Sequence, residues 1–337
     1  MLSPMYNEEQ RYYDEYETFC YQNCLRQVLE YYKVKCAYLY INASLSIVYK
    51  EIDQDDFDIS IDEEAYGVLP SFGSKVIRKS DDRDNRVIWD ENTSYIEKDY
   101  PIIVTVDSYY LKHLPFYEKS HGRHCMVVVG EVEDNAIVVD WQAPWFYKGK
   151  VDLEELFAAR NSQNEADGGV FSGNAIKNNW AYIEKEGWEA EPSQLVKEII
   201  EVTKHQYTKF IENDTFYCID AYKKIKEYFG RLIEYDVTER KKRIKNMYNA
   251  LYWPVRKRNF FNFYIKRAID DKVLSSDNIG VYDYSVQLFD DWTLFLNFVL
   301  KHSFIGKDSS IEKIVAELDK LIDKEETFKM MLFQMSI

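Results

Sequence analysis

The chain has 337 residues, of which 46% are hydrophobic, and a formal net charge of −15. This length suffices for one large domain or two ordinary ones, and the apolar content is ample for a core, so a disordered chain is not expected. The negative charge argues against nucleic acid as a partner, because phosphate contacts require clustered basic side chains.

Neither a secretion signal nor an apolar run long enough to span a bilayer is visible in the sequence. The 5 Cys are irregularly spaced, which favours free thiols in a reducing compartment over a disulfide framework. We therefore expect a cytoplasmic protein without a membrane contact.

The first part of the chain mixes helical and strand patterns. A helix is expected to begin near Cys20, because Leu25, Val28 and Leu29 recur at helical spacing. Four apolar runs are predicted to be strands, at residues 102–106, 125–129, 136–139 and 180–183. Between them we expect a hairpin connection at 130–135, an irregular aromatic loop at 141–149 and a helix at 151–160.

The pattern changes near residue 190, after which only helical periodicity is found. Helices are expected at 193–211, 216–235, 237–269, 284–304 and 310–335. Pro254 is expected to break or kink the third of these. The predicted fold class is therefore α+β. A domain of residues 1–190, with its N-terminal helix packed on an antiparallel sheet, precedes an all-helical cap domain of residues 191–337 that faces substrate or partner.

Three segments supply the residue types of an activated cysteine nucleophile. Cys20 opens the first helix, His124 opens an apolar strand, and Asp140 closes the next strand. A helix N-terminus lowers a thiol pKa, a nearby His takes the thiol proton, and a carboxylate fixes the His tautomer. The pattern predicts a Cys-His-Asp triad, whereas the plainer interpretation of a single Cys is a small buried hydrophobe.

Other residues of the same types are alternative candidates. His113 and His121 lie in a polar loop before His124 and are possible substitutes for the base, and Asp107 is a rival to Asp140. The remaining thiols are interpreted as core packing, with Cys125 on the strand face opposite His124. They are Cys24, Cys36, Cys125 and Cys218.

Gln22 and Asn23 are candidate oxyanion donors, together with the backbone N–H of Cys20. The preferred interpretation of both side chains is nevertheless solvent-facing positions on the helix. Cys20 and Cys24 are four residues apart without nearby His spacing, so no metal site is expected. Phosphate-binding glycine loops and the G-x-S-x-G and H-E-x-x-H motifs are also missing from the sequence.

The second part of the chain concentrates positive charge between residues 240 and 267. The plainer interpretation is a solvated helix face that pairs with acidic neighbours. The alternative is a docking surface for an acidic partner. The candidate docking residues are Arg240, Lys241, Lys242, Arg243, Arg256, Lys257 and Arg258.

The same motifs carry a family resemblance. The segment that starts at Cys20, the strand with His124 and the strand ending in Asp140 resemble papain-fold bacteriocin-leader peptidases and their relatives. With the segments 101–111 and 114–117, they are similar to the N-terminal domain of butirosin biosynthesis protein H over residues 10–160. The papain-like peptidases usually carry a Gln six residues before the Cys, where this chain has Asp14. This departure argues against peptide hydrolysis by the usual arrangement.

The resemblance implies a papain-like fold with Cys20 as nucleophile, His124 as base and Asp140 as the group that orients the base. It also implies acyl transfer in the biosynthesis of specialised metabolites such as peptide, polyketide or antibiotic products. In that scheme Cys20 takes an acyl or aminoacyl group from an acyl or peptidyl carrier protein and passes it to a small-molecule amine. The phosphopantetheine thioester of the carrier is the donor arm, and the enzyme itself binds no cofactor.

The expected function is therefore that of a cysteine-dependent acyltransferase. The first alternative is a cysteine hydrolase or cyclase, such as a peptidase, amidase or thioesterase, that uses the same three residues. Dependence of product formation on an added amine would distinguish the two, because a transferase must favour aminolysis over hydrolysis. The second alternative is a non-catalytic binding module, in which Cys20 would be buried and slow to alkylate.

Overall fold

The structure is a computed structural model that describes residues 2–335 except 10, 12, 14, 15, 17, 18, 54, 55, 81, 142 and 143. The chain forms two compact units, one of residues 1–41 and 70–190 and the other of residues 42–69 and 191–337. Both units combine helices with an antiparallel sheet, and the C-terminal region is mainly helical.

The first unit contains a six-stranded antiparallel sheet in the order β3-β8-β4-β5-β6-β7. Its strands are β3 (Val76–Lys79), β4 (Ile102–Asp107), β5 (Arg123–Val132), β6 (Asn135–Asp140), β7 (Tyr147–Asp152) and β8 (Trp180–Ile183). Three α-helices belong to the same unit: α1 (Cys20–Tyr31), α2 (Asn85–Ile96) and α3 (Leu153–Asn161).

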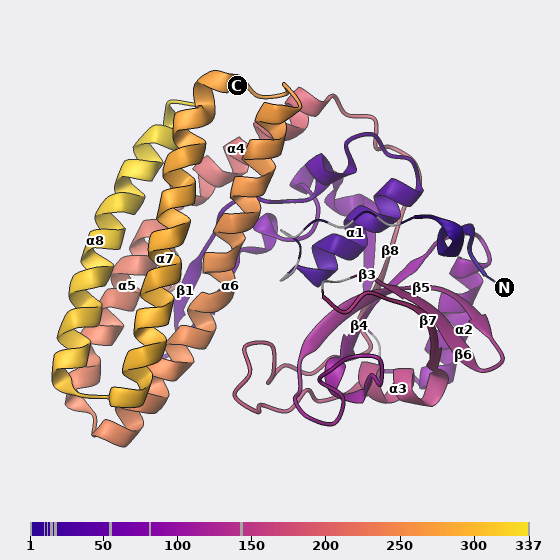
Figure 1. The fold of residues 1–337 in the computed structure, drawn as a ribbon, viewed down its shortest axis with the longest axis horizontal. Coiled ribbons are helices and arrows are strands. Elements are labelled where there is room, and N and C mark those ends of the chain that lie inside the picture. The colour runs from indigo at the N-terminus through magenta and orange to yellow at the C-terminus, as the bar shows by residue number, and fades with distance from the viewer. Residues whose placement is uncertain are drawn as a thin grey trace. The chain divides into compact units, whose positions relative to one another are not determined.

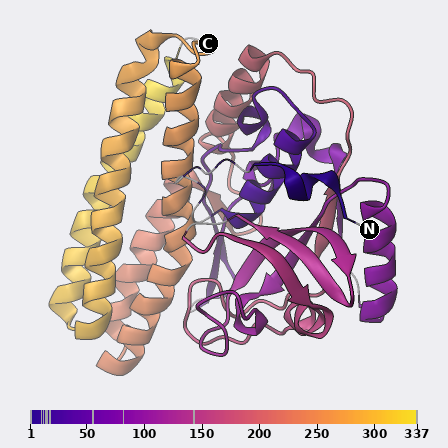
Figure 2. The ribbon, with the colours of Figure 1, turned by 45° about the vertical axis from the view of Figure 1, so that its right-hand side comes forward.

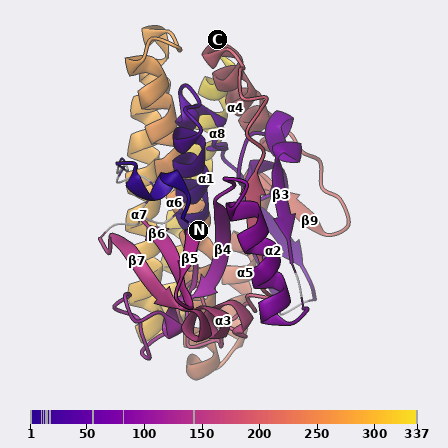
Figure 3. The same cartoon turned by 90° about the vertical axis from the view of Figure 1, so that its right-hand side faces the viewer.

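Side-chain alternation along the central strands creates two apolar faces. The core on one face takes every second residue of β4 and β5, and it also contains Trp89 of α2 and Leu156 of α3. These two helices lie alongside the strands in Figure 3. Helix α1 packs against β5, β4 and β8. Because α1 contributes no residue to the first core, we place α1 on the opposite face, where it sets the position of Cys20.

The second unit is built from five α-helices and a small sheet. The helices are α4 (Pro192–Gln206), α5 (Cys218–Arg231), α6 (Val237–Asp270), α7 (Ile279–Ile305) and α8 (Asp308–Phe333). Figures 1 and 2 show α5 to α8 side by side as long rods. The sheet is antiparallel, with β1 (Val48–Glu51) between β2 (Phe57–Ser60) and β9 (Thr215–Tyr217).

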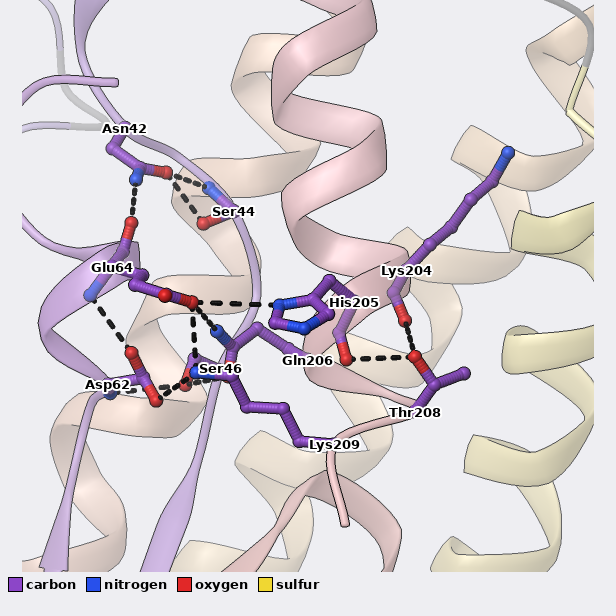
Figure 4. A network of polar contacts seen from close by, with 10 residues as sticks. All are labelled: Asn42, Ser44, Ser46, Asp62, Glu64, Lys204, His205, Gln206, Thr208 and Lys209. Carbon is purple, nitrogen blue, oxygen red and sulfur yellow. Dashed lines mark hydrogen bonds and ion pairs between the residues drawn. The ribbon is translucent and has the colours of Figure 1, made fainter. Parts of the chain in front are cut away.

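Residues 42–69 group with residues 191–337, which differs from the expected first domain of residues 1–190. Part of the physical reason for this grouping is a network of polar contacts, which Figure 4 shows. Lys209 Nζ lies 2.8 Å from Asp62 Oδ2 and 2.9 Å from Glu64 Oε2, and Gln206 accepts a hydrogen bond from Ser46 at 3.2 Å. These contacts tie the segment 42–69 to the end of α4 and the residues that follow it.

A buried lysine adds a second tie. The Lys257 side chain on α6 is 0% exposed, and its ammonium donates to the carbonyl oxygens of Asn42 at 2.5 Å and Ala65 at 2.9 Å. Burial lowers the pKa of Lys257 from 10.5 to about 7. The segment 42–69 is therefore anchored to α6 as well as to α4.

Several elements differ from the sequence prediction. Residues 191–337 are not all-helical, because Thr215–Tyr217 pairs with β1, and the expected aromatic loop at 141–149 ends in the strand β7. Helix α6 continues through Pro254, so of the expected break or kink the break is wrong. In the part of the chain that the structure describes, no helix is both long and apolar enough to cross a membrane.

Candidate functional site

Cys20 is the first residue of α1, as its sequence context predicts. The preceding residue, Phe19, has an apolar side chain that cannot accept a hydrogen bond from the first helical turn, so the turn has no side-chain cap. The positive end of the helix dipole therefore acts beside the Cys20 sulfur. The Cys20 side chain is partly buried, and its thiol is free.

His124 and Asp140 meet because β5 and β6 are neighbours in the sheet. The pairing of Val127 with Val139 brings the first residues of β5 beside the last residue of β6. His124 Nε2 lies 2.9 Å from Asp140 Oδ1 and 3.0 Å from Oδ2. His124 also interacts with Cys20, because each of these two groups shifts the pKa of the other. The structure therefore brings together the Cys, the His and the Asp that the sequence analysis selected.

The charges of these groups depend on one another. Burial alone would raise the pKa of Asp140, but His124 first and then His113 hold it below its ordinary value. Burial would also lower the pKa of His124, whereas the Asp140 carboxylate, with a smaller effect of Cys20, raises it well above its ordinary value. The stable form of the pair is thus an imidazolium beside a carboxylate.

Cys125 lies at the site, although the sequence analysis placed it in the core. Its thiol is buried, lies 3.7 Å from Thr105 Oγ1 and is in contact with the Cys20 thiol closely enough to raise the pKa of that thiol. This contact is the first reason why the pKa of the Cys20 thiol stands well above its ordinary value, and burial is the second. His124 acts in the opposite direction. The resting sulfur of Cys20 is therefore a thiol.

A second histidine contacts the same carboxylate. His113 Nε2 lies 3.1 Å from Asp140 Oδ2, and the His113 side chain is only 6% exposed. His113 was a candidate substitute for the base, but the hydrogen bond that the structure describes for its side chain is to Asp140. Its position could not be read from spacing, because it depends on how the loop after β4 folds back onto the end of β6.

The other alternative residues form a separate pair. His121 Nδ1 lies 2.7 Å from Asp107 Oδ2, and the Asp107 carboxylate also accepts hydrogen bonds from Ser162 Oγ and the backbone N–H of Gly122. This buried carboxylate holds together the loops around the start of β5. Neither His121 nor Asp107 contacts His124 or Asp140 by a hydrogen bond that the structure describes.

The expected positions of Gln22 and Asn23 need correction, because both side chains are buried instead of solvent-facing. Asn23 Nδ2 donates to the carbonyl of Trp141 at 2.8 Å, which anchors α1 to the residue after Asp140. Gln22 lies about 200° around the helix from Cys20, and its buried amide has no hydrogen-bond partner among the described residues. Asp14, where papain-like peptidases usually have Gln, lies outside the described residues.

Three of the seven candidate docking residues are buried, so they do not form a surface patch. Arg240 donates to backbone carbonyls of Leu232 and Gly306 at 2.8 Å, and Lys257 is bound as described above. Arg258 Nη2 lies 2.5 Å from Glu325 Oε1 inside the helical unit. Each of these three cations has partners inside the protein. The pattern of charges in the sequence could not distinguish such buried basic residues from exposed ones. Lys241, Lys242, Arg243 and Arg256 keep at least part of their side chains exposed.

Residues 20–141 match the family model described as butirosin biosynthesis protein H, N-terminal. The chain has a butirosin-H-like N-terminal domain. No curated protein matches the chain.

The butirosin-H-like match begins at Cys20 and ends one residue after Asp140. It therefore includes all three residues of the candidate site, and it also includes His113 and Cys125. It stops before β7, α3 and all the helices from α4 to α8. The resemblance found in the sequence is confirmed for this region, while the mainly helical region lies outside the match.

Proposed function

We propose that this protein is a cysteine-dependent acyltransferase of antibiotic or related biosynthesis, with a papain-like catalytic unit. The observation that supports the proposal best is the contact of Cys20, at an uncapped helix N-terminus, with a His124 that is bonded to the buried carboxylate of Asp140. The butirosin-H-like match supports the biosynthetic context. The proposed donor is an acyl or peptidyl carrier protein, and the proposed acceptor is a small-molecule amine.

The first half-reaction transfers the acyl group to the enzyme. The reacting form of the enzyme has first lost the proton on His124 Nδ1, the nitrogen opposite the one held by Asp140. This nitrogen can then accept the thiol proton as the Cys20 sulfur attacks the thioester carbonyl. The resulting oxyanion is stabilised by the helix N-terminus. When the intermediate collapses, the bond to the donor sulfur breaks and the donor thiol leaves with the proton from His124. Cys20 then carries the acyl group as a new thioester.

The second half-reaction returns the enzyme to its starting state. The amine nitrogen attacks the acyl carbonyl on Cys20, and His124 takes a proton from that nitrogen. The carbon–sulfur bond breaks, an amide is released, and the Cys20 thiolate regains its proton from His124. Water would give the free acid by the same steps, so exclusion of water and positioning of the amine decide the product.

Intact-protein mass spectrometry with a panel of acyl thioesters, including acyl carrier proteins, tests this proposal. The wild type should gain the mass of one acyl group, and the Cys20→Ala variant should gain none. Chasing the adduct with amines should release an amide. Release at the same rate without an amine would identify a hydrolase instead.

The same experiment can reject an enzymatic role. No adduct across the panel, together with slow labelling of Cys20 by iodoacetamide, would favour a non-catalytic binding module. Cys125→Ala is a suitable control, because it removes the neighbouring thiol while leaving Cys20 in place. Its acyl adduct should have the same mass as that of the wild type.

A further inference from the structure

Asp140 is bound by two imidazoles, and of these the structure describes an interaction with Cys20 for His124. The carboxylate is 1% exposed, and its Oδ2 lies 3.0 Å from His124 Nε2 and 3.1 Å from His113 Nε2. Oδ1 lies 2.9 Å from His124 Nε2. An ionised carboxylate only accepts hydrogen bonds, so both rings must present an N–H at Nε2. The carboxylate therefore fixes which nitrogen of the His113 ring carries the N–H that faces it.

Packing holds the His113 ring in place. The ring stacks on Tyr147 of β7 with centroids 4.2 Å apart and an interplanar angle of 19°. Its other nitrogen, Nδ1, is buried and has no hydrogen-bond partner among the described residues. A buried nitrogen without a partner costs folding free energy, so an apolar ring would serve packing on Tyr147 better than an imidazole. The Nε2–H donated to Asp140 is the property that a purely packing residue would lack.

We propose that His113 is a positioning residue for the Cys20–His124 pair, and this inference rests on the proposed function of that pair. By donating to Oδ2, His113 fixes the rotation of the Asp140 carboxylate. The carboxylate then keeps its hydrogen bonds to His124 Nε2, and with them the orientation of the ring that interacts with Cys20. Without His113 the carboxylate would be held by His124 alone and could turn about its own side chain.

The direction of the expected charge effect follows from the groups that face one another. Asp140 faces His124, His113 and, from α1, Cys24, while His124 faces Asp140 and Cys20. The His113 N–H dipole points its positive end at Asp140 and so weakens the attraction between Asp140 and protonated His124. Removing that dipole should raise the pKa of His124 further.

Two substitutions separate donation from packing. His113→Phe keeps a flat ring to stack on Tyr147 but removes the N–H, whereas His113→Gln keeps an N–H donor but removes the ring. His121→Phe is a matched control, because His121 also bonds a buried carboxylate, Asp107, and stacks on a tyrosine, Tyr109, with centroids 4.3 Å apart. All three variants should be measured in the full-length protein.

Three measurements are needed. The first is an NMR titration of the His124 ring, assigned with a His124→Gln variant. The second is the rate of Cys20 alkylation by iodoacetamide, and the third is the rate of Cys20 acetylation by the acetyl thioester of N-acetylcysteamine. Since a hydrogen bond to a charged group is worth about a factor of 10 to 100, His113→Phe should slow both reactions by about that factor.

The pattern across the variants decides the inference. We expect His113→Phe to raise the pKa of His124 and to slow both the alkylation and the acetylation of Cys20. His113→Gln should recover part of these rates. His121→Phe should leave the titration of His124 unchanged. Equal rate losses in His113→Phe, His113→Gln and His121→Phe that parallel losses in thermal stability would overturn it. The inference would also be overturned if His113→Phe left the titration of His124 and both rates of Cys20 reaction unchanged.

Two safeguards keep the test decisive. If His113→Phe does not fold, the ¹⁵N shifts of the wild-type His113 ring still decide, because a proton on Nδ1 instead of Nε2 is incompatible with donation to Asp140. If the wild type forms no acyl adduct, the proposed function fails, but the titration and the alkylation rate still report on His113. The two failures are therefore distinguishable.

Discussion

At the scale of single residues, Asp140 sets the charge of the whole candidate site. It is a buried carboxylate at the end of β6, and its only hydrogen-bond partners in the described residues are His124 and His113. Its charge is also the main reason why His124 holds a proton more tightly than an ordinary imidazole. The His124 imidazolium in turn lowers the pKa of Cys20, whereas Cys125 and burial raise it.

The pH dependence of Cys20 follows from these opposing effects. Both His124 and Cys20 have raised pKa values, so the pair gives up its first proton above the ordinary range of histidine. Asp140→Asn should remove the charge that supports the imidazolium, and the thiolate would then form only at higher pH. We expect the alkylation rate at pH 7 to fall by about 10²-fold or more, and its midpoint to move upward.

Alkylation of Cys20 followed by mass spectrometry over a range of pH measures both quantities. Asp107→Asn is the control, because it removes the carboxylate of the separate His121 pair. It should cost stability without moving the midpoint. An Asp140→Asn variant that alkylates like the wild type would show that the carboxylate does not govern the thiol.

The sequence was sufficient to predict that Cys20, His124 and Asp140 lie together, because each lies where a helix or strand begins or ends. It could not assign His113 and Cys125, because their contacts arise from the path of a loop and from the approach of α1 to β5. Gln22 and Asn23 were misjudged for a related reason. Whether a polar helix residue faces solvent depends on what packs against the helix, which periodicity alone does not reveal.

At the scale of elements, the segment 42–69 is the part of the fold that the sequence described least well. Its strands β1 and β2 are short, and β1 gains its second neighbour only from β9. Strand propensity over three or four residues is a weak signal when pairing depends on a distant segment. The long helices α6, α7 and α8 were predictable because their periodicity extends over many turns.

Lys257 makes this anchoring sensitive to pH. Its pKa is about 7 in the folded protein and near 10.5 in the unfolded chain, so the unfolded state binds more protons between these values. The contribution of Lys257 to stability should therefore rise with pH across that window, by at most about 1.4 kcal/mol per pH unit. It should be least favourable below pH 7, where the buried ammonium is charged.

Urea unfolding of the wild type and Lys257→Met at pH 7, 8 and 9 measures this effect. As pH rises, the unfolding free energy of the wild type should increase relative to that of Lys257→Met. Lys209→Met is the control, because Asp62 and Glu64 raise the pKa of Lys209 and place its titration above this range. A constant difference between the wild type and Lys257→Met would contradict the expected titration.

At the scale of the whole molecule, the chain passes between its two units three times, after residues 41, 69 and 190. The sequence suggested one passage near residue 190, since composition changes visibly only there. No comparable change in composition marks residues 42–69 as part of the second unit. Its membership is decided by Lys209, Lys257 and the pairing of β1 with β9, all of which involve residues more than 140 positions later.

This path predicts how the protein responds to a single cut. A protease site inserted after Gly187 would divide the chain into a fragment that holds residues 42–69 and a fragment that holds their partners. We expect both fragments to elute together in gel filtration after cleavage and to separate only in denaturant. Separation under native conditions would show that the contacts of residues 42–69 do not hold the second unit together.

The same path imposes an order on synthesis at the ribosome. Roughly 160 residues separate β1 from β9, so at about 5 to 20 residues per second the β1–β2 hairpin waits roughly 10 to 30 s for its third strand. During that interval β1 presents an open edge, which invites pairing with other chains. The acidic residues between Glu51 and Glu64 oppose such pairing, because nascent hairpins that all carry negative charge repel one another. This repulsion acts until α6 and β9 have been synthesised and can pack on the hairpin.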